Sequence, residues 1–179
     1  MFGWLRNLFG GGSSTANLPG DTSSGGVFSG LRGKALSIQR DEVGIRMPGA
    51  DAPVWGLLME TGYPGATATL LALADGTTSL YLSNGGGVIG GQAHASVREA
   101  NAAFLATANQ LRHLLKPAES YPIPAAGRTI FYARTDAGVL SGSGLEDELG
   151  HGRHPLSELF LAGHGVLTEL RLNTEGAGL

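Results

Sequence analysis

The strongest constraint on the fold is the Asp75-Gly76 pair, which lies between two strand-like runs at residues 67–74 and 77–83. Both residues of a two-residue hairpin turn must tolerate a positive φ, and aspartate followed by glycine does so readily. A third apolar run, residues 54–61, precedes this hairpin and is separated from it by a Gly-Tyr-Pro-Gly turn segment. The pattern therefore predicts three consecutive antiparallel strands.

The same arrangement recurs in the second half of the chain. A helix is predicted to begin at Ser96 and to end before Pro117, because apolar residues recur on one face at helical spacing. A second hairpin is predicted at residues 128–142, and a second long helix is predicted to start at Pro155. Two successive hairpin-then-helix units predict an α+β domain, in which two long helices pack on one antiparallel sheet. An edge strand is also expected at residues 34–40, where apolar and polar residues alternate.

The amino-terminal part of the chain differs in composition from the rest. Glycine accounts for 30 of the 179 residues, and residues 10–30 are rich in glycine, serine and threonine. Such a segment cannot offset the entropy cost of ordering, so a flexible tether is predicted there. A single folded domain is then expected at residues 31–179.

Residues 1–9 (MFGWLRNLF) are predicted to form an amphipathic tip, whose apolar side chains are Phe2, Trp4, Leu5, Leu8 and Phe9. An apolar tip at the end of a tether is typical of a docking segment that enters a groove on a protein partner. A protein partner is favoured over lipid, because one arginine attracts anionic headgroups weakly. The alternatives are peripheral membrane contact and a tip that frays or folds back onto its own domain.

Composition excludes several classes of protein. The chain has no cysteine, so disulfide scaffolds, cysteine-ligated metal centres and thiol nucleophiles are excluded. The formal net charge of −3 offers no positive field for nucleic acid. No apolar run approaches the roughly 18 residues of a transmembrane helix, and the first residues lack the features of a secretory signal. We therefore expect a cytoplasmic protein without cofactor or nucleic acid, and its oligomeric state is left open.

The most unusual string is SNGGGVIGG at residues 83–91, between a predicted strand and a predicted helix. Backbone N–H groups in such a loop can cradle an anion, so the ligand-binding candidates are Asn84, Gly85, Gly86, Gly87, Gly90 and Gly91. No lysine followed by serine or threonine comes after the glycines, and no βαβ unit surrounds them, so a dinucleotide site is not expected. We favour the alternative, a connection that turns tightly with Val88 and Ile89 tucked inward.

Three polar side chains are candidates for catalysis near this loop. Antiparallel connectivity would bring the loops at residues 62–66 and 84–94 to the same end of the sheet. Glu60, Tyr63 and His94 could then lie close together, and a carboxylate, a phenol and an imidazole are sufficient for acid–base work or for gripping a polar ligand.

Each of these three residues also has a purely structural explanation. Glu60 can pair with an arginine such as Arg128 or Arg134. Tyr63 can build the turn together with the proline that follows it. His94 can cap the entry of the predicted helix.

A second polar cluster, residues 146–154 (EDELGHGRH), holds three carboxylates and two histidines. His151 and His154 are weak candidates for metal ligands, together with nearby glutamates. The ligand set is incomplete in sequence, because no H-E-x-x-H or similar spacing appears and His164 falls on a different helix face. A solvated acidic surface, with His154 as a helix cap, is the preferred interpretation.

Four strings, METGYP, ALADGTTSLY, GGGVIGG and GRHPLSELF, cover much of the predicted domain. In these strings the chain resembles a group of uncharacterised bacterial proteins, and the resemblance implies a bacterial, cytoplasmic context and no activity. At a coarser level, hairpins that alternate with helices are similar to α+β modules of the roadblock, longin and profilin-like type, which often serve as adaptors. This second likeness concerns the fold alone and transfers no residues.

The leading functional hypothesis is a non-enzymatic interaction or adaptor module, in which the tethered tip adds a second contact to a protein partner. Two linked weak contacts can give strong avidity through effective concentration. The alternative is a small-ligand or acid–base enzyme site at the loops 62–66 and 84–94.

Overall fold

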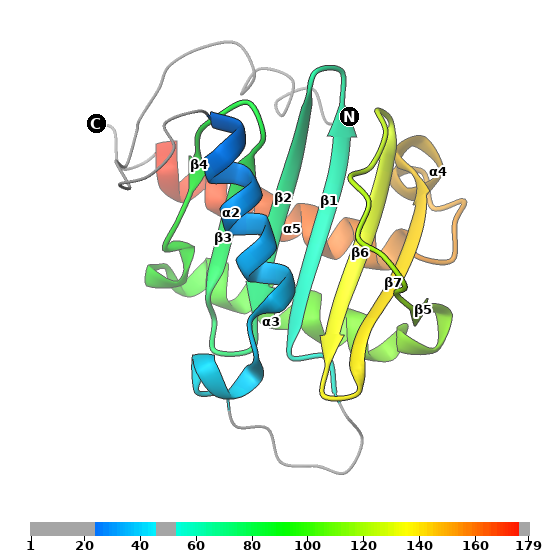
Figure 1. The fold of residues 1–179 in the computed structure, drawn as a ribbon, viewed down its shortest axis with the longest axis horizontal. Helices are drawn as coiled ribbons and strands as arrows, with labels where there is room; N and C mark the ends of the chain where they lie inside the picture. The colour runs from blue at the N-terminus through cyan, green and yellow to red at the C-terminus, as the bar shows by residue number, and fades with distance from the viewer. Residues whose placement is uncertain (1–23, 46–52, 176–179) are drawn as a thin grey trace.

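One antiparallel sheet forms the centre of the fold (Figure 1). The computed structural model describes residues 24–45 and 53–175. All neighbouring strands pair antiparallel in the order β4-β3-β2-β1-β6-β7-β5. The strands are β1 (Gly56–Tyr63), β2 (Ala66–Leu73), β3 (Thr78–Leu82), β4 (Gly87–Val88), β5 (Lys116–Pro117), β6 (Arg128–Thr135) and β7 (Gly138–Leu145). The predicted α+β class with an antiparallel sheet is confirmed.

The predicted hairpin around Asp75-Gly76 joins β2 to β3. Gly76 has a φ of 92°, and the Asp75 carboxylate accepts a hydrogen bond of 2.8 Å from the backbone N–H of Thr77. The turn therefore uses both the positive φ and the side-chain acceptor that this residue pair offers. β1 pairs with β2 on one side and with β6 on the other, so it lies between the two predicted hairpins at the middle of the sheet.

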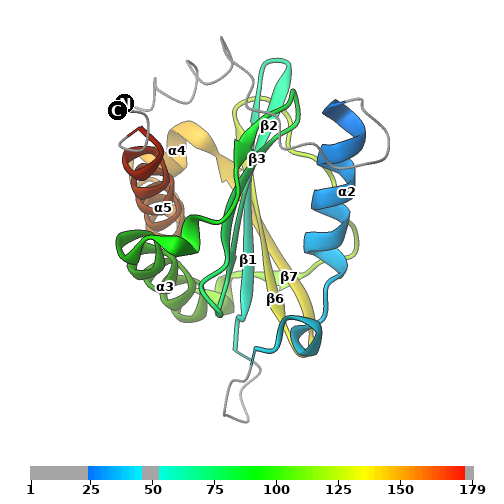
Figure 2. The ribbon, with the colours of Figure 1, turned by 90° about the vertical axis from the view of Figure 1, so that its left-hand side faces the viewer.

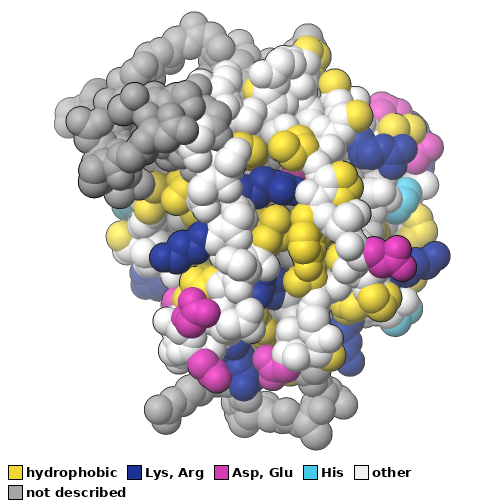
Figure 3. Space-filling view, viewed as in Figure 1, with side chains coloured by type: hydrophobic (Ala, Val, Ile, Leu, Met, Phe, Trp, Pro, Cys, Tyr) yellow, Lys and Arg dark blue, Asp and Glu magenta, His cyan; other side chains and the backbone are white. Residues whose placement is uncertain are grey.

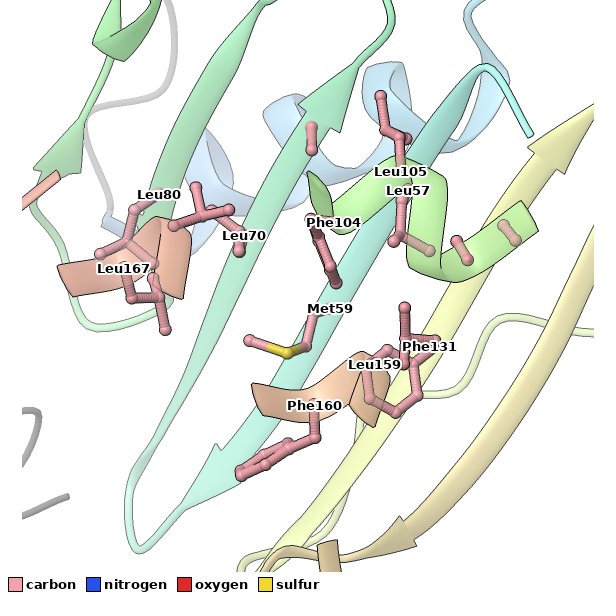
Figure 4. Close-up of a cluster of buried hydrophobic side chains, with 14 of the residues drawn as sticks. Leu57, Met59, Leu70, Leu80, Phe104, Leu105, Phe131, Leu159, Phe160 and Leu167 are labelled. Carbon is pink, nitrogen blue, oxygen red and sulfur yellow. The ribbon is translucent and has the colours of Figure 1, made fainter. Parts of the chain in front are cut away.

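Two long helices, α3 (Ala95–Gln110) and α5 (Ser157–Glu175), pack side by side on one face of the sheet, which we call the α3/α5 face (Figure 2). Gly163 on α5 lies against β1, where a Cβ atom would stand 2.6 Å from the Met59 sulfur. The missing side chain thus allows the close approach of α5 to β1. Figure 4 shows the core between these layers, with Leu57, Met59, Leu70, Leu80, Phe104, Leu105, Phe131, Leu159, Phe160 and Leu167.

A third long helix, α2 (Ser24–Ser37), covers the opposite face of the sheet, which we call the α2 face (Figures 1 and 2). The predicted edge strand at residues 34–40 is wrong, because most of this segment belongs to α2 and to the 3-10 helix η1 (Arg40–Val43). Phe28 and Ala35, two helical turns apart, are buried against the sheet. The packing of these two side chains against the sheet stabilises a helix, although the short alternation of apolar and polar residues suggested a strand.

The predicted tether at residues 10–30 is therefore too long, because α2 begins at Ser24. The rest of the tether and the tip at residues 1–9 lie outside the described residues. The short elements are η2 (Gly91–Ala93), η3 (Arg112–Leu114) and α4 (Glu146–Gly150). With helices on both faces, the sheet is the middle layer of three.

Candidate functional site

Glu60 lies on the α2 face, with its side chain fully buried. Both of its carboxylate oxygens accept hydrogen bonds from the guanidinium group of Arg32 on α2, at 2.7 and 2.8 Å, and Thr69 donates a third at 2.9 Å. The prediction that Glu60 pairs with an arginine is correct in kind, but the partner is Arg32 and neither Arg128 nor Arg134. The arginine comes from a helix that the sequence pattern did not predict.

This ion pair is largely shielded from solvent. Arg32 also donates to the backbone carbonyl oxygens of Tyr121 and Pro122 at 2.9 and 3.2 Å. The hydroxyl of Tyr132 donates to the Pro122 carbonyl at 2.8 Å. Burial raises the pKa of Tyr132 to about 12, and the negative charge of Glu60 adds to the effect. At neutral pH this phenol is a hydrogen-bond donor and carries no charge.

Tyr63 lies on the other side of the sheet from Glu60. Residues alternate between the two faces of a strand, and the Tyr63 side chain packs against the core of the α3/α5 face. Burial raises the pKa of its hydroxyl, and the neighbouring Glu146 carboxylate raises it further. Glu60 and Tyr63 therefore do not face one site.

His94 is exposed and stands at the N-cap position of α3, where its side chain makes no capping hydrogen bond. α3 covers the face opposite the one to which Glu60 points (Figure 2). The structure thus does not bring the three predicted acid–base groups together on one face of the sheet. An enzymatic role for any of them remains a prediction from sequence.

The glycine loop forms the turn between β3 and the short edge strand β4. Gly85, Gly86 and Gly87 have φ values of 102°, 85° and 147°. The Leu82 backbone N–H donates to Gly86 O at 3.2 Å, and the Gly85 N–H donates to Leu82 O at 3.0 Å. Asn84, at the tip of the turn, is exposed. These three glycines are thus required by the backbone geometry of the turn.

The remaining glycines of this loop lead into α3. Gly90 has a φ of 85° and precedes η2. Gly91 is buried where a Cβ atom would collide with Leu170 on α5. Val88 packs against the core as predicted, whereas Ile89 is 64% exposed and does not point inward. A ligand-binding role for the loop remains a prediction.

The two histidines proposed as weak metal candidates make local contacts. His151 Nδ1 lies 2.7 Å from the Asp147 carbonyl oxygen and 3.2 Å from its carboxylate. His154 Nδ1 accepts a hydrogen bond of 3.1 Å from the backbone N–H of Leu156, just before α5 begins at Ser157. Within residues 24–45 and 53–175, no group of three or more His, Cys, Asp or Glu side chains could hold a metal ion.

A groove of about 640 Å³ lies beside β7, at a place that the sequence pattern did not indicate. Its walls are formed by the connection that carries β5 and by the segment that precedes α5. The lining residues are Leu114, Lys116, Pro117, Glu119, Ser120, Pro122, Ile130, Tyr132, Ser141, Gly142, Ser143, His154, Pro155 and Leu156. The α2 face, on which Tyr132 and Ile130 lie, carries a gathering of hydrophobic side chains near its middle (Figure 3).

The groove borders an open stretch of the sheet edge. β5 pairs with β7 only at Leu140 and Ser141, and Val139 O accepts a hydrogen bond from the Ala118 N–H on that side. Backbone groups of an antiparallel strand alternate between its two neighbours, so Ser143 and Leu145 also direct N–H and C=O groups away from β6. Among the described residues, no strand pairs with this end of β7 on its outer side.

A comparison with protein-family models finds no match, and comparisons with curated proteins and with solved structures find none either. The resemblance to bacterial proteins in the four sequence strings therefore remains a prediction. In the part of the chain that the structure describes, no helix is both long enough and apolar enough to cross a bilayer.

Proposed function

We propose that this protein is a non-enzymatic interaction module that binds an extended segment of a partner protein in the groove beside β7. The observation that carries the proposal is the coincidence of this groove with the open backbone edge at Ser143 and Leu145. An added strand would satisfy the outward N–H and C=O groups of β7, and the groove walls would select its side chains.

The walls suit a peptide that is mostly apolar. Pro117, Pro122 and Leu156 supply apolar surface, while Lys116 and Glu119 supply one charge of each sign. Backbone pairing gives such a site affinity for many sequences, and the walls then provide specificity. An adaptor requires this combination of affinity from backbone pairing and specificity from the groove walls.

The tip at residues 1–9 provides a second contact in this proposal. A segment rich in glycine and serine separates the tip from α2 in the sequence. The tip can therefore be linked to the domain without being part of its hydrophobic core. Two linked contacts of modest strength raise overall affinity through effective concentration. The tip and the β7 groove would then bind two parts of one partner.

The test uses substitutions at one position of the β7 edge. Ser143→Pro removes the outward N–H of β7 and is compatible with an edge strand, because that N–H does not pair with β6. Ser143→Ala is the matched control, since it removes the same hydroxyl and keeps the backbone donor. We expect Ser143→Pro to weaken partner binding about tenfold or more and Ser143→Ala to leave it close to wild type.

Partners are captured in the native host by a photo-cross-linking amino acid at Ser120 on the groove wall. The same group at Thr168, exposed on α5, serves as the control position outside the groove. The proposal is supported by a protein that cross-links to position 120 in the wild-type and Ser143→Ala backgrounds and is lost with Ser143→Pro. Identical cross-links in all three backgrounds, or from position 168 alone, contradict it.

A further inference from the structure

We propose that the sheet surface beneath α2 is a second docking site, which binds an amphipathic helix carrying an arginine, and that α2 is its displaceable cover. This site adjoins the groove beside β7 and shares Tyr132 with it, but it does not include the outer edge of β7. α2 itself shows what the site requires, because it fills the site in the described structure (Figure 1).

The apolar part of the site is a compact set of sheet side chains. Phe28 and Ala35 of α2 are buried against them, and Leu31 is packed against the same cluster. These three positions follow the i, i+3, i+7 spacing of one helix face. The residues on and beside the sheet that belong to the same cluster are Trp55, Leu58, Leu71, Leu73, Tyr81 and Tyr132.

Glu60 makes the site selective for a cation. Its carboxylate is fully buried within this apolar surface, and Arg32 of α2 supplies the two charge-assisted hydrogen bonds that compensate for its burial. A buried carboxylate without such a partner is strongly destabilising. The planar fork of arginine fits both oxygens at once, which the single ammonium group of lysine does not. A helix that replaces α2 must therefore bring an arginine to Glu60.

Arg134 recognises the end of the helix through the backbone. Its guanidinium group donates to the carbonyl oxygens of Ala35, Leu36 and Ile38, at and just beyond the carboxyl end of α2, and it lies 4.8 Å from the centre of the Trp55 ring. The last carbonyl groups of any helix lack partners within the helix. Arg134 therefore sets the direction of the bound helix without demanding a particular side chain.

α2 is a poor competitor for the site that it occupies. Four of its fourteen residues are glycine, at positions 25, 26, 30 and 33, and glycine is among the least favourable residues in a helix interior. A Cβ atom at Gly30 or Gly33 would meet nothing within 4 Å, so packing does not require these two glycines. A partner helix with ordinary residues at the exposed positions would occupy the site at a lower conformational cost.

The probe is a labelled 14-residue peptide with the α2 sequence, in which all four glycines are replaced by alanine. Its binding to the full chain is measured by fluorescence anisotropy. We expect saturable binding that changes when the cover is altered. Gly30→Ala with Gly33→Ala in the chain strengthens α2 and should weaken peptide binding up to about 25-fold, since each substitution favours the helix about fivefold. Phe28→Ala in the chain weakens α2, leaves the sheet surface intact and should tighten peptide binding.

Two changes in the peptide test the recognition of Glu60. Alanine in place of the arginine equivalent to Arg32 should reduce affinity at least tenfold. Alanine in place of the lysine equivalent to Lys34, which is exposed on α2, is the control and should leave affinity unchanged. The absence of saturable binding by the parent peptide overturns the proposal. Binding that ignores both the arginine and the Gly30→Ala, Gly33→Ala pair overturns it as well.

These outcomes are separable from those at the β7 groove. The Gly30→Ala, Gly33→Ala chain is expected to fold at least as well as wild type, so the test does not depend on Phe28→Ala. Ser143→Pro changes the edge of β7 only and should leave the affinity of the peptide unchanged.

Discussion

At the scale of single residues, the described structure buries polar groups in the core whose burial the sequence pattern alone does not predict. His164 on α5 is 6% exposed, and its ring lies 4.3 Å from that of Phe160. Burial lowers its pKa from 6.5 to about 4, because the charged imidazolium is poorly solvated there. Glu60 is a contrasting case, because it is buried beside a basic partner, Arg32, at 2.7 Å.

The depressed pKa of His164 predicts a specific loss of stability in acid. Above pH 6.5 the ring is neutral in both states and has no effect. As the pH falls from 6.5 to 4, the His164 ring binds a proton in the unfolded chain but not in the folded chain. This difference lowers the free energy of unfolding by about 3 kcal/mol. Urea unfolding from pH 7 to 4 should show this loss, and His164→Phe should reduce it. An equal decline in both proteins would contradict the assignment.

At the scale of elements, α5 contains two glycines that differ in their surroundings. A Cβ atom at Gly163 would lie 2.6 Å from the sulfur of Met59 and 3.1 Å from the Phe104 ring. A Cβ atom at Gly165 would meet nothing within 4 Å. The first glycine sets the distance between α5 and β1, whereas the second only weakens the helix.

This contrast predicts opposite effects of the same substitution two residues apart. Gly163→Ala should destabilise the protein by about 1–2 kcal/mol, because overpacking against β1 exceeds the gain in helix propensity. Gly165→Ala should stabilise it by up to about 1 kcal/mol. Thermal and urea unfolding of the two variants measure the difference directly. A stabilising Gly163→Ala would show that α5 does not approach β1 closely.

At the scale of the whole molecule, α2 turns a two-layer arrangement into a sheet covered on both faces (Figure 2). With α2, the described fold includes residues 24–30, which composition alone assigns to the tether. The boundary also bears on the proposed docking site, because α2 covers the surface around Glu60.

The revised boundary predicts the effect of truncation. A chain that starts at Ser24 keeps Phe28, which is 5% exposed, whereas a chain that starts at Leu31 loses it. The shorter chain should be less stable by about 3 kcal/mol or more, the usual cost of removing a buried phenylalanine. Urea unfolding of the two truncated proteins tests this, and equal stabilities would restore the boundary predicted from composition.

The sequence by itself determined the sheet hairpins and two of the three long helices, because turn chemistry and hydrophobic periodicity are local properties. Asp75-Gly76 predicts its turn from two adjacent residues, and the spacing of apolar residues indicates α3 and α5 without reference to the rest of the chain.

Only the tertiary structure decided which distant residues meet. α2 has weak local signals, since its glycines lower helix propensity and its apolar positions are few, and it is held by contacts with strands far along the chain. The Arg32–Glu60 pair joins residues 28 positions apart, and the groove combines segments near residues 116, 143 and 155. Glu60 and Tyr63 are close in sequence but point to opposite faces, because a strand alternates its side chains and the helices on each face decide what they touch.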